Sequence, residues 1–81
     1  MKLRFTEKAD KDYAGLPVVI RKAFGRQLRF LLANRAHPSL RAKKYSEAED
    51  VWQARVTRDW RFYFQIDGDE YVILSIIPHP K

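Results

Sequence analysis

Residues 54–64, ARVTRDWRFYF, alternate apolar and polar side chains, pass through Arg58 and Asp59, and then alternate again. A period of two is typical of a strand with one buried face, so this stretch predicts a β-hairpin. Arg55 and Arg61 then face each other on neighbouring strands. Like charges in this position destabilise a strand pair by about 0.2 to 1 kcal/mol, which suggests that an anion binds between them.

The segments on either side of the hairpin complete a small α+β fold. In chain order we expect a strand at 2–6, a helix from Thr6 to Gly15, a helix from Pro17 to about Asn34, and strands at 51–57, 60–66 and 71–77. Thr6 and Gly15 are residue types that cap the two ends of a helix. The order βααβββ predicts two N-terminal helices packed on one face of a mainly antiparallel four-stranded sheet.

Strand parity divides the side chains of this sheet between two faces. The side chains expected to face the helices are Trp52, Ala54, Val56, Trp60, Phe62, Phe64, Val72, Leu74 and Ile76. Those expected on the other face are Arg4, Gln53, Arg55, Thr57, Arg61, Tyr63, Gln65, Tyr71, Ile73, Ser75 and Ile77, followed by His79. Because the helices cover one face only, the second set would line an open, basic surface that a ligand can reach.

Length and composition indicate a single domain over residues 1–81, with 46% hydrophobic residues to form one modest core. The absence of Cys favours a reducing, cytoplasmic setting and leaves neither a disulfide nor a thiolate metal site. The longest apolar run, residues 71–77, is too short to cross a membrane, and the N-terminus predicts no signal peptide.

Positive charge is concentrated in one part of the chain. The net charge is +6, and no Asp or Glu occurs between Tyr13 and Ser46. The basic residues in this window are Arg21, Lys22, Arg26, Arg29, Arg35, Arg41, Lys43 and Lys44. A stretch of one sign indicates a polyanionic partner, either nucleic acid or an acidic protein, although such charge also serves solubility alone.

Other kinds of site have little support. His37 and His79 are the only histidines, so no metal-ligand spacing exists, and no Gly-rich phosphate loop or nucleophile elbow is present. We therefore expect neither a metal nor a cofactor. Simpler interpretations of the basic face are that Arg55 is solvated or paired with Glu70, and that His79 is solvated near the chain end.

Two runs, HPSLRAKKY at 37–45 and VWQARVTRDWRFYFQIDGDEYVILSIIPH at 51–79, resemble the RelE/ParE superfamily of bacterial type II toxins. The closer resemblance is to its RelE and HigB-like mRNA interferase branch. It rests on a basic segment before the sheet, Trp-x-x-Arg in the next strand, an aromatic residue followed by Arg, and a His after the last strand. The resemblance implies a ribosome-dependent endoribonuclease that cuts mRNA and is neutralised by a cognate antitoxin.

The resemblance also implies roles for individual residues. Arg55 and Arg61 match the arginines that contact the scissile phosphate, Lys43 and Lys44 match the basic pair before the sheet, and His79 matches the general acid/base. Lys44 would contact phosphate or act as the base. The further residues expected to bind RNA are Arg4, Arg41, Arg58 and Tyr63. The implied reaction is metal-free attack of a ribose 2′-hydroxyl on the adjacent phosphate, which leaves a 2′,3′-cyclic phosphate and a 5′-hydroxyl.

The chain departs from the family pattern after His79, where many relatives continue with another Arg or Tyr. Glu47, Glu49, Tyr63 or Lys81 are the substitutes to be considered for the missing acid/base group. Two alternatives stay open: a ParE-like poison of DNA gyrase, and a non-catalytic RNA-binding module. The presence of His79 and the lysine pair favours the nuclease.

Overall fold

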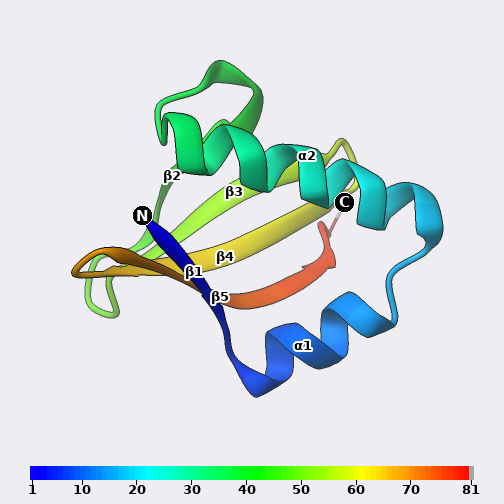
Figure 1. Cartoon of the computed structure of the whole chain (residues 1–81), viewed down its shortest axis with the longest axis horizontal. Helices are drawn as coiled ribbons and strands as arrows, with labels where there is room; N and C mark the ends of the chain where they lie inside the picture. Colours follow the sequence, from blue (N-terminus) through cyan, green and yellow to red (C-terminus); the bar gives the residue numbers. More distant parts are fainter. Residues whose placement is uncertain (81) are drawn as a thin grey trace.

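A computed structural model of the chain describes residues 1–80 and confirms the α+β class (Figure 1). The elements are β1 (Lys2–Phe5), α1 (Glu7–Ala14), α2 (Val18–Ala33), the 3₁₀ turn η1 (Pro38–Leu40), β2 (Lys43–Ser46), β3 (Val51–Thr57), β4 (Trp60–Asp67) and β5 (Glu70–Pro78). None of the helices in this part of the chain is long and apolar enough to span a membrane.

The sheet has five strands in the order β1-β5-β4-β3-β2, so the predicted count of four is wrong. The additional strand is β2, which was expected to be a basic loop and instead pairs antiparallel with β3. Two lysines in a strand of four residues give little sequence signal, because lysine is depleted in strands overall and tolerated at sheet edges. β1 pairs in parallel with β5, and every other pairing is antiparallel.

Both helices contribute to one core against the sheet. Phe24 and Leu31 of α2 and Ala9 of α1 are fully buried together with Phe62 and Phe64 of β4. The rings of Phe24 and Phe62 meet edge to face with centroids 5.3 Å apart. In Figure 1, α2 runs across the strands while α1 lies beside β5. Within residues 1–80 the opposite face of the sheet carries no helix, as predicted.

The predicted parity is wrong over part of β5. Tyr63 pairs with Ser75 but Phe64 pairs with Ile73, so Leu74 is an extra residue in β5, a β-bulge. An extra residue turns every side chain before it to the opposite face. Tyr71 and Ile73 consequently lie in the core, with exposed fractions of 4% and 0%.

Val72 and Leu74 correspondingly belong to the open face. Val72 pairs with Gln65 of β4 and with Arg4 of β1, and both of these were expected on that face. The bulge therefore exchanges Tyr71 and Ile73 for Val72 and Leu74 on the open face.

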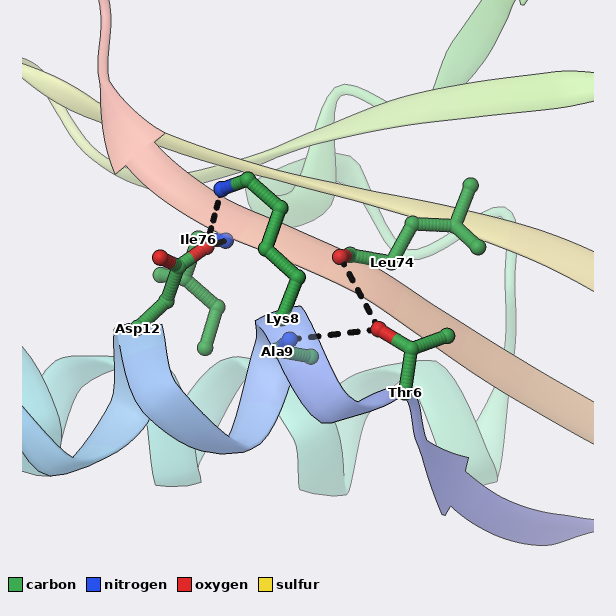
Figure 2. Close-up of polar contacts among 6 residues, drawn as sticks. All are labelled: Thr6, Lys8, Ala9, Asp12, Leu74 and Ile76. Atoms are coloured by element: carbon green, nitrogen blue, oxygen red, sulfur yellow. Dashed lines mark hydrogen bonds and ion pairs between the residues drawn. The ribbon is translucent and has the colours of Figure 1, made fainter.

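Side chains from the helices bind the backbone where the sheet edges are left unpaired. β1 pairs only with Glu70–Ile73, and beyond it the Asp12 carboxylate accepts a hydrogen bond from the Ile76 N–H at 2.9 Å. Thr6 caps α1 and donates its hydroxyl to the Leu74 carbonyl at 3.1 Å (Figure 2). On the other edge, Gln27 of α2 donates to the Arg55 carbonyl at 2.8 Å.

Candidate functional site

The open face is hollowed next to the turn that joins β3 and β4. The hollow has a volume of about 210 Å³ and is lined by Arg41, Lys43, Gln53, Arg61 and His79. Four of these five residues were predicted to bind or cleave RNA, and none of the described residues that line the hollow is a carboxylate. Each of these residues comes from a different part of the fold: the segment after η1, the strands β2, β3 and β4, and the residues after β5. We call this hollow the Arg61 hollow.

Arg61 is held in place by the β3–β4 turn. Its Nη1 atom donates hydrogen bonds to the carbonyl oxygens of Thr57 at 2.7 Å, Arg58 at 3.2 Å and Trp60 at 2.9 Å. A guanidinium carries five N–H donors in a rigid fork, so anchoring one nitrogen fixes the direction of the other donors. The turn thus orients Arg61 before any ligand arrives.

Arg61 lies in a strongly positive environment. Burial lowers the pKa of its guanidinium from the usual value, and the charges of Arg55 and Arg41 lower it further. An arginine side chain stays protonated in spite of such a shift, so the repulsion persists at neutral pH. A bound anion would relieve that repulsion and receive charge-assisted hydrogen bonds.

Arg55 lies directly opposite Arg61 in the strand register, as predicted. Its side chain, however, lines a neighbouring hollow of about 570 Å³ and not the one that holds Arg61. Arg58 of the turn also lines the neighbouring hollow, and Arg41 lines both. The two arginines that were expected to hold one anion between them therefore belong to adjacent hollows that share Arg41.

Arg41 and His79 are fixed through their backbones. Arg41 ends η1 in the left-handed conformation with φ of 46°, which costs a non-glycine residue about 1 kcal/mol or more. The His79 N–H donates to the Asp59 carbonyl at 2.7 Å, so the segment after β5 is tied to the β3–β4 turn. His79 itself is exposed, so a ligand in the Arg61 hollow can reach its imidazole.

Aromatic side chains adjoin the Arg61 hollow. Tyr63 accepts a hydrogen bond from Gln53 Nε2 at 2.9 Å, and the Tyr45 ring meets the Tyr63 ring edge to face at 4.9 Å. Both tyrosines line a further, more apolar hollow of about 280 Å³ with Leu74 and Ile77. Tyr45 and Gln53 were not predicted as site residues. Alternation with Lys43 would have placed Tyr45 on this face if β2 had been recognised.

Two predicted site residues lie elsewhere. Lys44 pairs in register with Trp52, its ammonium lies 5.0 Å from the Trp52 ring centroid, and it forms an ion pair with Asp50. Lys44 is therefore on the helix side of the sheet, and its placement does not support a role as base in the Arg61 hollow. Arg4 donates to Glu70 at 2.9 Å near the β4–β5 turn, on the far edge strand.

The substitutes considered for a missing acid or base are also dispersed. Glu49 lines the hollow of the two tyrosines, and Glu47 is exposed in the turn between β2 and β3. Lys81 lies outside the described residues. Glu70 bonds Arg4, so the simpler interpretation in which Glu70 neutralises Arg55 is wrong.

Comparison with known proteins gives a family match over nearly the whole chain. The model of the family described as "ParE toxin of type II toxin-antitoxin system, parDE" matches residues 3–80. None of the curated protein sequences matches.

Solved structures with a similar fold include three bacterial toxins. A YoeB/ParE toxin from Agrobacterium tumefaciens is 16% identical with a TM-score of 0.83, over 99% of this chain and 100% of that chain. The isolated E. coli RelE toxin is 18% identical with a TM-score of 0.79, over 99% of this chain and 85% of that chain. A heterotetrameric YoeB-YefM toxin-antitoxin complex from Staphylococcus aureus contains a chain that is 18% identical with a TM-score of 0.78. The match covers 99% of this chain and 98% of that chain. At such identities the likeness shows a shared fold.

Proposed function

The chain belongs to the family of ParE toxins of type II toxin-antitoxin systems, and we propose that it is a ribosome-dependent endoribonuclease that cleaves mRNA. The observation that carries this proposal is the Arg61 hollow, which collects two arginines, a lysine and a histidine without a carboxylate. Such a set suits a phosphodiester, because the cations bind its oxygens and the imidazole moves a proton.

The proposed reaction is attack of a ribose 2′-oxygen on the adjacent phosphorus. The 2′-proton leaves to water, the P–O5′ bond breaks, and the 5′-oxygen takes a proton, so the products are a 2′,3′-cyclic phosphate and a 5′-hydroxyl. Arg61, oriented by the turn carbonyls, and Arg41 stabilise the negative charge that develops on the phosphoryl oxygens. His79 protonates the leaving 5′-oxygen.

The residues that line the hollow include one imidazole and no carboxylate, so a dedicated general base is missing from them. An enzyme of this kind depends on a substrate that is already held near the reactive geometry. Such positioning contributes about 7 to 11 kcal/mol in well-oriented systems. The proposal therefore assigns the positioning of the mRNA to the ribosome.

We further propose a cognate antitoxin that covers the Arg61 hollow. The positive hollow is complementary to an acidic segment, and electrostatic complementarity favours fast and specific association. The YoeB-YefM complex shows that a protein with this fold is found bound to an antitoxin. Expression of the chain without its partner should arrest bacterial growth, and harmless expression would contradict the toxin activity.

A reconstituted translation reaction tests the nuclease activity. Primer extension on the mRNA should reveal new 5′ ends within the reading frame only when ribosomes and the protein are both present. A gyrase cleavage assay run alongside tests the second candidate, a ParE-like poison, which the family match itself favours. Intact mRNA together with trapped gyrase–DNA complexes would replace the nuclease proposal with that candidate.

A further inference from the structure

The larger hollow beside the Arg61 hollow is lined by four arginines that come from four different parts of the fold. They are Arg26 of α2, Arg41 after η1, Arg55 of β3 and Arg58 of the β3–β4 turn. We propose that this four-arginine hollow binds a second phosphate of the same single-stranded RNA whose scissile phosphate lies in the Arg61 hollow. The inference rests on the proposed function and adds the path of the substrate.

The ion pairs found within residues 1–80 do not include the arginines of the four-arginine hollow. None of the described residues that line it is a carboxylate, and the ion pairs involve Lys2, Arg4, Lys8, Lys11 and Lys44 instead. Four guanidinium groups around about 570 Å³ repel one another, so an anion from outside is stabilised there. The arginine fork also matches the paired oxygens of a phosphate.

A buried glutamine makes the wall of this hollow rigid. Gln27 is 2% exposed, and its Nε2 donates to the carbonyl oxygens of Ser39 at 3.0 Å and Arg55 at 2.8 Å. The Ser39 hydroxyl donates back to Gln27 Oε1 at 3.1 Å. These bonds join α2, η1 and β3, so the segments that carry Arg26, Arg41 and Arg55 are held together before a ligand binds.

The two hollows are adjacent. Arg41 lines both of them, and Arg55 and Arg61 are direct neighbours across β3 and β4. Consecutive phosphates of one strand can therefore occupy adjacent hollows, with Arg41 between them. An acidic protein segment fits less well, because stable protein contacts centre on buried aromatic or aliphatic anchors. The apolar residues in the lining of the larger hollow are only Pro38 and Val56.

Binding of single-stranded RNA oligonucleotides of increasing length, followed by fluorescence anisotropy as a function of salt, tests the path. The test variant is the double substitution Arg26→Ala, Arg58→Ala, which leaves the lining of the Arg61 hollow intact. The matched control is Lys22→Ala, Arg29→Ala, which removes the same charge from exposed positions of α2 outside both hollows.

If the four-arginine hollow binds one phosphate, the double variant should lose up to about 0.7 from the slope of log affinity against log salt, the value for one phosphate contact to a single strand. The control should keep the slope of the native protein. An equal loss in both variants would show that only overall charge matters and would overturn the proposal.

Two probes separate RNA from other anions. Inorganic phosphate that binds the four-arginine hollow as tightly as any oligonucleotide identifies a free-anion site and overturns the path. If the double variant loses binding to poly-glutamate but keeps its binding to RNA, the ligand of the four-arginine hollow is an acidic protein segment. That result would also overturn the proposed RNA path. The RNA-binding experiment does not depend on cleavage. If the protein fails to cleave mRNA in the translation reaction, the proposed reaction is wrong, but the RNA-binding result still tests the path of the RNA.

Discussion

Arg61 combines a structural contact with the proposed catalytic one, and the two can be separated. Its lowered pKa means that the folded protein disfavours the charged guanidinium, so the charge costs stability throughout the pH range in which arginine is protonated. Loss of the hydrogen bonds to the turn carbonyls acts in the opposite direction, at about 0.5 to 1.5 kcal/mol each. The two effects oppose each other when the side chain is removed.

We expect Arg61→Ala to remain folded and to lower mRNA cleavage by roughly 10²- to 10³-fold, the usual loss when one group that stabilises transition-state charge is removed. Arg61→Lys should recover little, because an ammonium cannot present two parallel donors to a phosphate. Thermal unfolding and primer extension check the two parts. Native cleavage by Arg61→Ala would show that the side chain only supports the turn.

The two neighbouring lysines of β2 lie on opposite faces of the sheet, so one can serve as the control for the other. Lys43 lines the Arg61 hollow, whereas Lys44 pairs with Asp50 beside Trp52. Lys43→Ala should reduce the salt slope of RNA binding by about 0.7, and Lys44→Ala should leave it unchanged. Anisotropy titrations at several salt concentrations measure both. An equal reduction in the two variants would mean that RNA responds to the charge of this edge rather than to the hollow.

At the scale of elements, α1 is attached to the sheet by one carboxylate that serves two partners. Asp12 accepts from the Ile76 N–H and pairs with Lys8 at 2.8 Å (Figure 2). Asp12→Ala should lower the free energy of unfolding by about 1.5 to 3 kcal/mol, because a hydrogen bond to a charged group is lost and a backbone donor is left unpaired. Urea denaturation measures the change.

Lys8→Ala is the control for Asp12→Ala, since it removes the same ion pair and keeps the bond to β5. An exposed pair of this kind is worth about 0.3 to 0.5 kcal/mol. If both variants lose the same stability, the contact between Asp12 and β5 contributes nothing measurable.

The sequence was most informative where a periodic pattern extended over several residues. The bounds of β3 were predicted from its alternation, and the same alternation placed Arg55 opposite Arg61. β2 was missed because four residues with two lysines do not show a pattern. The bulge at Leu74 was missed because an extra residue depends on pairing with β4 and leaves no local signal. The separation of Arg55 from Arg61 into two hollows likewise depends on α2 and η1, which no strand pattern describes.

At the scale of the whole molecule, the net charge of +6 is distributed so that the acid-free part of the chain supplies Arg26, Arg41 and Lys43 to the two basic hollows. We expect RNA or ribosome affinity to fall steeply with salt, with a slope of roughly −0.7 for each phosphate contact to a single strand. Sedimentation with ribosomes at several salt concentrations measures it. Affinity that stays flat from low to physiological salt would exclude a phosphate-based interface.

The parallel pairing of β1 with β5 has a consequence for the biosynthesis of the protein. β5 lies between β1 and β4, although it is the last strand in chain order within residues 1–80. A nascent chain that lacks residues 70–78 can form α2 and the β3–β4 hairpin, but β1 and α1 have no strand to join, and His79 has not yet been added. Closure of such sequence-distant contacts is slow and comes late in folding. The ribosome that translates this chain therefore carries an incomplete sheet until residues 70–78 have been added.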